Sequence, residues 1–319
     1  MQITTQSFGT TPDDIAAAAG ILRAGGLVGF ATETVYGLGG DARNDRAVAR
    51  IFEAKGRPHF NPLIVHLPDW QRAQAYAVFS DQAKALAAKF WPGPLTLVLP
   101  FVEGSGLSPL VTAGLDSVAI RVPAHPVARA LLRAFDGPVA APSANPSGRV
   151  SPTRAAHVLA GLSGKIEAVL DAGPCGVGVE STILGLVDGP VLLRHGGLPA
   201  EALEAALGTT LTTGGNAQKP SAPGQLASHY APEAAVRLNV TCPAQGEFWV
   251  GFGPDCTGAD MSLSPSGDLV EAAANLFHIL RVADSRANGS IAFAPVPEVG
   301  LGRAINDRLR RAAAPRPKG

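Results

Sequence analysis

Helical patterns and short apolar runs alternate along the first two thirds of this chain, and the alternation limits the possible folds more than any other feature. Residues 11–26 open with Thr-Pro, carry two early acids and close on two glycines, which is typical of a helix. The apolar run 27–32 is short enough to be a buried strand. Because few tight two-residue turns join such runs, the pattern predicts an α/β fold with an open, twisted mixed sheet and flanking helices. Further helices are expected at 44–57, 80–91, 125–135, 151–162 and 198–207, and further strands at 62–67, 95–100, 117–123, 137–144, 165–173, 181–187 and 190–196.

The composition changes after residue 207, and this change divides the chain. Residues 208–235 are rich in Gly, Thr, Ser and Pro and show no apolar periodicity, so we expect a linker. Strand-like runs then return, together with a long amphipathic helix at 267–287 and a terminal helix at 301–313. The sequence therefore predicts a large α/β domain at 1–207 and a small, Rossmann-like α/β domain at 236–319.

Charge and cysteine usage argue against several functional classes. Lys plus Arg and Asp plus Glu number 26 each, so the formal net charge is zero and extended nucleic-acid binding is disfavoured. The three cysteines are far apart and include no C-x-x-C motif, which favours reduced thiols over zinc or disulfide roles. No apolar stretch reaches the roughly 18–20 residues that span a bilayer. The N-terminus lacks the basic start and apolar core of a signal peptide, so we expect a cytoplasmic protein.

Common catalytic and nucleotide-binding motifs are absent from the sequence. There is no G-x-x-x-x-G-K-[ST] loop, and GVGVES at 176–181 lacks the third glycine and the helix of a dinucleotide fingerprint. The sequence also has no H-E-x-x-H, no G-x-S-x-G and no clustered His and Cys residues. Any metal ion is therefore expected to arrive with a phosphate rather than to be held by protein side chains.

Polar residues instead collect where the predicted strands end, which is where open α/β sheets bind ligands. Thr32, Thr34 and Tyr36 alternate, so an extended backbone would point their hydroxyls the same way. The turn at 143–148 and a helix starting at Ser151 would both suit an anion. The five polar stretches are 31–42, 55–67, 117–123, 141–153 and 178–183.

Each candidate residue also has an ordinary structural explanation. Arg121 lies in an apolar strand, where it could form an ion pair with a buried acid. His66 could be a core histidine whose hydrogen bonds are satisfied. Other residues could form a solvated helix end (Lys55, Arg57), a strand-end cation (Arg194) or a linker anchor (Tyr230).

Taken together and in order, these motifs resemble the YrdC-type threonylcarbamoyl-AMP synthases. TETVYGLG, KGRP…NPL, FWPGPLTLVL, VAIRVP, PSAN…SG…SPT and ESTI cover nearly all of residues 10–200. PG…HYAP in the linker and the ending GLGRAINDRLRRAA match the long form, in which a small C-terminal domain follows a YrdC-like domain. The resemblance implies that L-threonine, bicarbonate and ATP, normally with Mg²⁺, give threonylcarbamoyl-AMP and pyrophosphate. The product would pass to a separate transferase complex that modifies an adenosine beside the tRNA anticodon.

The resemblance also implies roles for individual positions. Arg121 would bind the threonine carboxylate in a two-pronged contact. Lys55 and Arg57 would be catalytic cations and, with Arg194, would neutralise phosphate charge as pyrophosphate leaves. The linker, which carries Tyr230, would cover the nucleotide. The threonine side would comprise Thr34, His66, Arg121, Ser143 and Ser181, and the ATP side Arg57, Asn61, Ser117, Asn145, Thr153, Arg194 and Tyr230.

Two other functions remain open at this point. YrdC-like domains have a concave surface, so an RNA-binding module is one alternative, although the zero net charge and the few aromatic residues disfavour it. The other is an enzyme that handles a different carbamoyl adenylate, as the YrdC-like domain of hydrogenase maturation proteins does. The chain lacks the zinc-finger-like cysteines and the acylphosphatase-like segment expected of that class.

Overall fold

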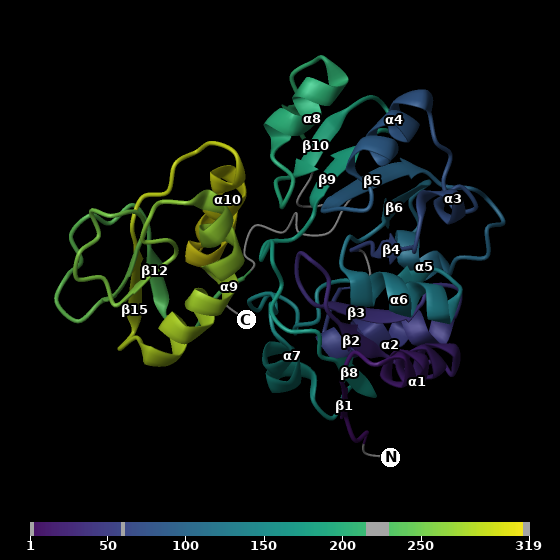
Figure 1. The fold of residues 1–319 in the computed structure, drawn as a ribbon, viewed down its shortest axis with the longest axis horizontal. Coiled ribbons are helices and arrows are strands. Elements are labelled where there is room, and N and C mark those ends of the chain that lie inside the picture. Colours follow the sequence, from purple (N-terminus) through teal and green to yellow (C-terminus); the bar gives the residue numbers. More distant parts are fainter. Residues whose placement is uncertain (1–2, 59–60, 215–229, 315–319) are drawn as a thin grey trace.

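The computed structural model describes residues 3–58, 61–214 and 230–314 of the chain (Figure 1). The helices are α1 (Pro12–Arg23), α2 (Asp45–Lys55), α3 (Trp70–Ala73), α4 (Asp81–Phe90), α5 (Pro109–Thr112), α6 (Pro126–Phe135), α7 (Ala155–Leu162), α8 (Ala200–Leu207), α9 (Leu269–Arg286) and α10 (Leu301–Ala313). The strands are β1 (Gln6–Phe8), β2 (Val28–Phe30), β3 (Gly37–Asp41), β4 (Ile64–His66), β5 (Leu95–Pro100), β6 (Ser117–Arg121), β7 (Val139–Ala140), β8 (Ala168–Leu170), β9 (Thr182–Gly185), β10 (Val191–Arg194), β11 (Thr212–Thr213), β12 (Ala235–Arg237), β13 (Phe248–Gly251), β14 (Met261–Ser262) and β15 (Ser290–Phe293).

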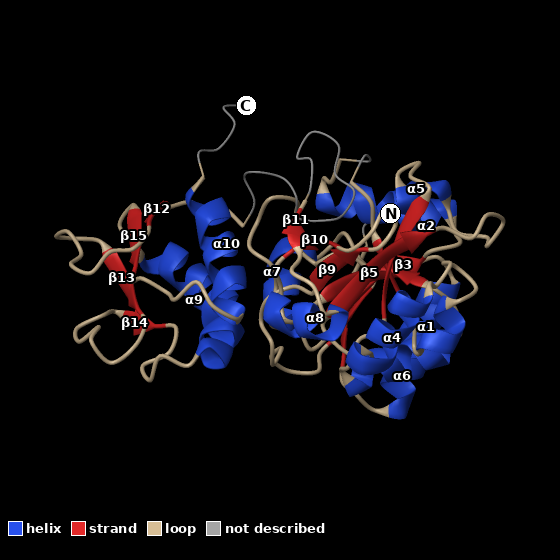
Figure 2. Cartoon of the chain, turned by 90° about the horizontal axis from the view of Figure 1, so that it is seen from above, coloured by secondary structure: helices blue, strands red, loops and turns tan. Residues whose placement is uncertain are grey.

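The strands form two separate sheets. The larger sheet has eleven strands in the order β1-β8-β2-β3-β7-β4-β6-β5-β9-β10-β11 and mixes parallel with antiparallel pairs. The smaller sheet has the order β12-β15-β13-β14 and is parallel throughout. Both sheets carry flanking helices, so the predicted α/β fold with an open mixed sheet and a second, smaller α/β unit is confirmed (Figure 2).

Local sequence signals explain why most helices begin and end where they do. The Thr11 side chain accepts a hydrogen bond from the backbone of Asp14, whose carboxylate accepts one in return, and this capping box starts α1. Asn44 caps α2 in a similar way, and Gly56 ends that helix with a left-handed φ of 60°. This ending places Lys55 in the last turn of the helix and Arg57 directly after Gly56.

The predicted helix start at Ser151 is wrong. The helix α7 begins at Ala155, and residues 151–153 lie before it and form hydrogen bonds with other loops. The Ser151 hydroxyl donates to Glu180, and the carbonyls of Pro152 and Thr153 accept hydrogen bonds from other segments of the large domain. Because these contacts fix the backbone outside the helix, Ser151 does not present a helix terminus to an anion.

The glycine-rich stretch after β2 forms a strand that the apolar pattern did not predict. β3 pairs antiparallel with β2, and a Cβ atom added at Gly39 would lie 2.9 Å from both Phe30 and Val139 side-chain atoms. The stretch before it is a turn rather than extended backbone, because the Thr32 hydroxyl donates to the Val35 carbonyl at 2.6 Å. The Tyr36 hydroxyl consequently donates to the carbonyl of Gly173, and the expectation that it would accompany the threonines is wrong.

The four-stranded sheet belongs to a C-terminal unit whose two long helices face the large domain. Figures 1 and 2 show α9 and α10 between the small sheet and the large domain. The predicted amphipathic helix is α9, whose buried residues include Ala273, Leu276, Leu280 and Ala283. β11 still belongs to the large sheet and β12 begins at Ala235, so strands occupy both ends of the predicted 208–235 linker. Residues 215–229 of that linker lie outside the described residues.

Apolar and polar contacts join the two units. Val35, Val150 and Val179 of the large domain belong to the same buried cluster as the core of α9 and α10. Arg281 of α9 donates a hydrogen bond to the carbonyl of Val150. No helix in the described part of the chain is both long enough and apolar enough to cross a membrane.

Two histidines stack at this interface and should make its stability sensitive to acid. The rings of His157 and His278 lie 5.5 Å apart, and the Thr153 N–H donates to His157 Nδ1, so a proton there would oppose that donor. Burial, and then the charges of Arg281 and His278, lower the pKa of His157 to about 3.

An unfolded histidine binds a proton near pH 6.5, so the neutral His157 ring contributes stability above about pH 6.5 that is lost as the pH falls toward about 3. We expect the unfolding free energy of the wild type to fall more between about pH 7 and about pH 5 than that of His157→Gln. The difference should stay below about 1 kcal/mol per pH unit because the ring is only partly buried. Denaturant titrations at several pH values measure it, and equal slopes for the two proteins would contradict the expectation.

Candidate active site

A buried polar cavity opens over one face of the large sheet. Its charged side chains are Arg57, Arg121, Arg194 and Glu180, and it also contains the imidazole of His66. The remaining lining residues are Thr32, Thr34, Val35, Gly37, Ile64, Ala141, Pro142, Ser143, Ser181 and Tyr230. Eight of the predicted site residues therefore line this cavity: Thr34, Arg57, His66, Arg121, Ser143, Ser181, Arg194 and Tyr230.

Strand alternation explains why these polar side chains share one face of the sheet. In β4, β6 and β5 every second residue packs into the main core, including Val65, Ile120 and Leu97. The opposite face therefore presents His66, Arg121 and Thr96. His66 pairs in register with Arg121, and Arg121 pairs in register with Thr96. The three side chains thus stand on adjacent strands about 4.8 Å apart.

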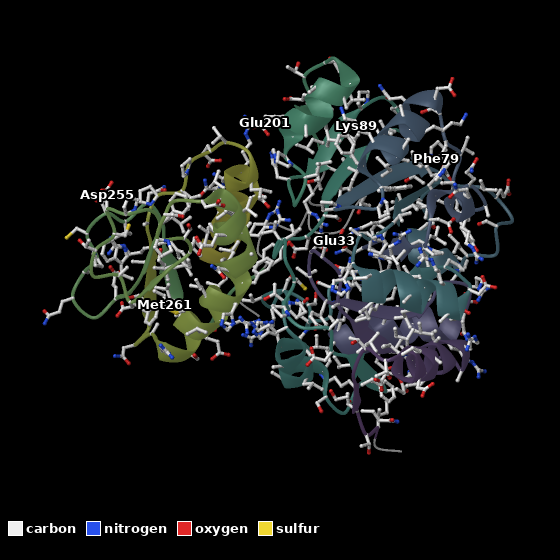
Figure 3. All side chains as sticks on the ribbon, in the orientation of Figure 1. Glu33, Phe79, Lys89, Glu201, Asp255 and Met261 are labelled. Carbon is white, nitrogen blue, oxygen red and sulfur yellow. The ribbon has the colours of Figure 1, made fainter. Side chains whose placement is uncertain are left out.

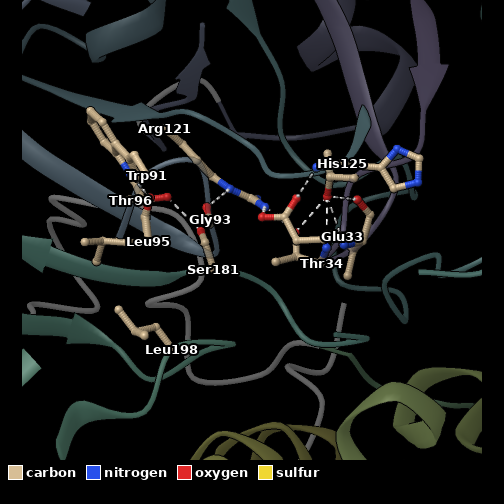
Figure 4. A network of polar contacts seen from close by, with 12 residues as sticks. Glu33, Thr34, Trp91, Gly93, Leu95, Thr96, Arg121, His125, Ser181 and Leu198 are labelled. Carbon is tan, nitrogen blue, oxygen red and sulfur yellow. Dashed lines mark hydrogen bonds and ion pairs between the residues drawn. The ribbon is translucent and has the colours of Figure 1, made fainter. Parts of the chain in front are cut away.

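Arg121 is held from three directions (Figure 4). Its Nη2 donates to Glu33 Oε1 at 2.7 Å, its Nη1 to the Thr34 hydroxyl at 2.8 Å and its Nε to the Gly93 carbonyl at 3.3 Å. Burial would raise the pKa of Glu33, but the charge and hydrogen bond of Arg121 outweigh it, and the pKa is lowered. The ion pair with a buried acid, one of the alternatives for Arg121, is therefore present, and it orients the guanidinium at the cavity wall. Figure 3 labels Glu33 on the side of the large domain that faces α9 and α10.

His66 is neutral at physiological pH. Burial, and then the positive charge of Arg121, lower its pKa to about 3. Its Nδ1 lies 3.2 Å from the Ile64 carbonyl, so Nδ1 carries the hydrogen and Nε2 is the acceptor. A neutral imidazole beside Arg121 can accept a hydrogen bond from an amine or hydroxyl of a ligand without repelling the arginine.

Ser181 joins the two halves of the cavity. Its hydroxyl lies 2.7 Å from that of Thr96, and Arg194 Nη2 donates to the same hydroxyl at 3.1 Å. Arg194 also donates from Nε and Nη2 to the Ser181 carbonyl, at 3.0 and 2.9 Å. The residue predicted for the threonine side therefore contacts one predicted for the ATP side.

Arg57 and Arg194 place two buried guanidinium groups in the same cavity. Burial, and then repulsion by Arg194, lower the pKa of Arg57 to about 10, and burial also lowers that of Arg194 to about 10. Arg57 donates to the carbonyls of Pro62 and Asn61, at 3.0 and 3.4 Å, and forms no ion pair with any carboxylate of the described residues. Two buried cations that repel each other favour an anionic ligand between or beside them.

Lys55 is buried rather than solvated, but its ammonium group does not line the cavity. It donates to the carbonyls of Ser143 and Asn145 and so fixes the turn that carries both residues. Burial, and then repulsion by Arg57, lower the pKa of Lys55. The geometry thus gives Lys55 a supporting place behind the 143–148 turn, and its predicted catalytic role stays a prediction.

Three predicted ATP-side residues do not line this cavity but have buried polar atoms without a partner among the described residues. Asn61, Asn145 and Thr153 are buried, and Asn61 Oδ1, Asn145 Oδ1 and Thr153 Oγ1 have no hydrogen-bond partner within the described ranges. Buried polar atoms are nearly always paired with protein, water or a ligand, so these three atoms are available to a ligand that reaches them.

The last two predicted ATP-side residues differ in position. Tyr230 lines the cavity, adopts a left-handed φ of 62° and stacks on Phe277 of α9 at 5.3 Å. Ser117 begins β6 while Arg121 ends it, so the two are about 13 Å apart along the strand. Ser117 does not line the cavity, and its assignment to ATP stays a prediction without support from this geometry.

The sequence interpretation missed Glu33, Thr96 and Glu180. Both acids stand inside the quoted motifs, flanked by small or apolar residues, and that position was the signal that each has a buried cationic partner. No group of three or more His, Cys, Asp or Glu residues that could hold a metal ion exists among residues 3–58, 61–214 and 230–314. Glu180 of the cavity and Glu33 beside Arg121 are already paired with arginines.

Two family models together match residues 20–196 and 198–314. Residues 20–196 match the Sua5, YciO and YrdC family, whose model carries the description "telomere recombination". Residues 198–314 match the model of the threonylcarbamoyl-AMP synthase C-terminal domain.

Curated relatives match over almost the whole chain. Threonylcarbamoyl-AMP synthase of Bacillus subtilis is 42% identical over 334 aligned residues, covering 98% of this chain and 96% of the relative. That of Pyrococcus abyssi is 42% identical and covers 93% of each chain. The crystal structure of P. abyssi Sua5 complexed with L-threonine has a TM-score of 0.88 at 40% identity and covers 98% of both chains. Escherichia coli YciO, with a TM-score of 0.56 at 23% identity, shares the fold over 60% of this chain.

Proposed function

The chain belongs to the threonylcarbamoyl-AMP synthase family in its two-domain form, and from this premise we propose how its cavity divides the reaction. It is a transferase that makes threonylcarbamoyl-AMP, used in tRNA modification, from L-threonine, bicarbonate and ATP. We propose that 1–207 is the catalytic domain, 208–235 the linker and 236–319 the C-terminal domain.

The observation that carries the division is the placement of Arg121, His66 and Ser181 on one sheet face beside two further buried arginines. Arg121 would bind the threonine carboxylate, since Glu33 and Thr34 orient its guanidinium at the cavity wall while each terminal nitrogen keeps a second N–H to donate. His66 Nε2 and the hydroxyls of Thr34 and Ser181 would receive the amine and hydroxyl of threonine. Ser143 at the 143–148 turn would complete this side.

The nucleotide would lie toward Arg57 and Arg194. Asn61, Asn145 and Thr153 support this placement because each has a buried polar atom to offer. Tyr230 would cover the nucleotide from the C-terminal side. Ser117 remains on the ATP side by resemblance alone.

The reaction then needs positioning more than a protein nucleophile. The deprotonated threonine amine attacks bicarbonate, and a carbamate forms as water leaves. If it attacks carbon dioxide derived from bicarbonate instead, the carbamate forms as the nitrogen loses a proton. A carbamate oxygen next attacks the α-phosphate of ATP, and the bond to the leaving pyrophosphate breaks. Arg57 and Arg194 would stabilise the charge that accumulates on the leaving group, with Lys55 fixing the adjacent turn.

Mg²⁺ would enter as a complex with the phosphates of ATP, because the described residues offer no cluster of metal ligands of their own. We further propose that the product passes to a separate tRNA-modifying transferase complex and that the chain works in the cytoplasm, where ATP and tRNA are available.

Pyrophosphate release tests this function. We expect release only when ATP, L-threonine and bicarbonate are all present, and omission of any one should reduce the rate to background. Salt-sensitive RNA binding without turnover would instead favour the RNA-binding alternative. Turnover that requires bicarbonate but not threonine would favour an enzyme of another carbamoyl adenylate.

A further inference from the structure

The helix α10 of the C-terminal domain carries a buried arginine toward the cavity of the other domain. Arg308 is 1% exposed and is among the largest fully buried side chains of the described chain. The face of α10 that carries Arg308 is otherwise apolar: Ala304, Ile305 and Ala312, each about one helical turn from Arg308, are buried. A guanidinium group in such a place is costly unless it is paired, so its partners indicate what it is there to hold.

Arg308 pairs with its neighbour Asp307 at 2.9 Å, and its three other partners adjoin or belong to the proposed site. Its Nε donates to Glu180 Oε2 at 3.0 Å, and Glu180 directly precedes Ser181. Its Nη1 donates to the carbonyl of His195 at 2.6 Å, and His195 directly follows Arg194. Its guanidinium carbon also lies 5.6 Å from the centre of the Tyr230 ring.

Glu180 also connects Arg308 to a second segment of the large domain. The second carboxylate oxygen accepts a hydrogen bond from the Ser151 hydroxyl at 2.5 Å. Burial would raise the pKa of Glu180, but the charges of Arg308 and then Arg194 outweigh it and lower the pKa to about 2. The carboxylate therefore stays ionised and ties α10 to the segment that bears Ser181.

We propose that Arg308 is a positioning residue through which the C-terminal domain sets the geometry of Ser181, Arg194 and Tyr230. The inference rests on the proposed function, which places Arg194 and Tyr230 on the ATP side and Ser181 on the threonine side. Arg308 does not line the cavity, and its Nη2 has no hydrogen-bond partner among the described residues. It fixes three segments that come from separate parts of the chain, so the nucleotide half is complete when α10 is docked.

A second ion pair between α10 and the large domain provides a matched control. Arg303 Nη2 lies 3.4 Å from Glu201 Oε1 of α8, and the side chains are 40% and 44% exposed. Figure 3 labels Glu201 on α8 at the side that faces α10. Neither residue lines the cavity, so removing this pair changes the same interface without touching the site.

The test compares steady-state kinetics of full-length Arg308→Met, Arg308→Lys and Arg303→Met with the wild type. We expect Arg308→Met to raise the KM for ATP and to lower kcat by about tenfold or more each, since small misplacements of catalytic groups are costly. Arg308→Lys keeps the charge but loses the planar fork, so its values should lie between those of Arg308→Met and the wild type. Arg303→Met should stay within about twofold of the wild type.

Removing one member of a buried ion pair can also prevent folding, so a double variant completes the test. Arg308→Met with Glu180→Gln removes both charges of this ion pair. We expect its melting temperature to recover relative to Arg308→Met while its KM for ATP stays raised. A purely structural role would instead restore both quantities together.

Three outcomes would overturn the inference. These are wild-type kinetics in folded Arg308→Met, wild-type kinetics in the double variant, or failure of every Arg308 variant to fold. Absence of threonine- and bicarbonate-dependent turnover in the wild type is a different result, because it would refute the proposed function itself.

Discussion

Replacing Arg121 with methionine is expected to lower kcat/KM for L-threonine by about a hundredfold to a thousandfold, the cost of leaving a buried charge without its partner. The substrate carboxylate would enter a cavity wall that no longer offers the two nitrogens now donating to Glu33 and Thr34. The KM for ATP should change far less, because Arg57 and Arg194 remain. Pyrophosphate-release kinetics at varied threonine and at varied ATP measure the two effects separately.

This prediction needs a control because Arg121→Met also leaves Glu33 buried without a partner. The double variant with Glu33→Gln removes that charge, so it should regain stability but not threonine affinity. Arg43→Met, which breaks an exposed pair with Asp41, should leave both kinetic constants near wild type. Recovery of threonine kinetics in the double variant would show that Arg121 serves only to balance Glu33.

Replacing Arg57 with methionine is expected to lower kcat by about a hundredfold to a thousandfold, the usual effect of removing one donor that stabilises transition-state charge. Its guanidinium lies in the cavity with that of Arg194, and the two repel each other when no anion is bound. Loss of Arg57 should therefore weaken ATP binding. For the stability of the ligand-free protein, relief of this repulsion should offset the loss of the hydrogen bonds to Asn61 and Pro62. The melting temperature of the ligand-free variant should consequently stay close to that of the wild type.

Calorimetric titration with ATP and thermal unfolding of the same Arg57→Met samples separate binding from stability. An unfolded variant would assign Arg57 to the structure, and full turnover would remove it from the ATP side. Retained ATP affinity with low kcat would limit its role to the departure of pyrophosphate.

Much of the fold could be predicted from local signals in the sequence. Thr11 and Gly56 mark the ends of helices through hydrogen bonds and backbone angles that lie within a few residues. The strands β4, β5 and β6 are short apolar runs, as buried strands usually are. The strand β3 was not predicted because its glycines interrupt the apolar pattern, although they permit close packing against Phe30.

The parts that could not be predicted depend on contacts between distant segments. A Ser-Pro pair at 151–152 is a good helix start, but the hydrogen bond from Ser151 to Glu180 places the start later. The sequence shows that Arg308 falls on the apolar face of a helix, yet nothing local indicates that Glu180 is its partner. Strand register, in contrast, brought His66 and Arg121 together from an alternation that is visible in the sequence.

The central claim is that one buried cavity joins threonine, bicarbonate and ATP, and the identity of the product tests it most directly. The purified full-length chain would be incubated with L-threonine, ATP and isotope-labelled bicarbonate, and the products separated and weighed by mass spectrometry. The account predicts an adenylate that contains threonine and one labelled carbon, formed by the wild type and strongly reduced in Arg121→Met and Arg57→Met. An adenylate without the labelled carbon, or equal yields from all three proteins, would contradict it.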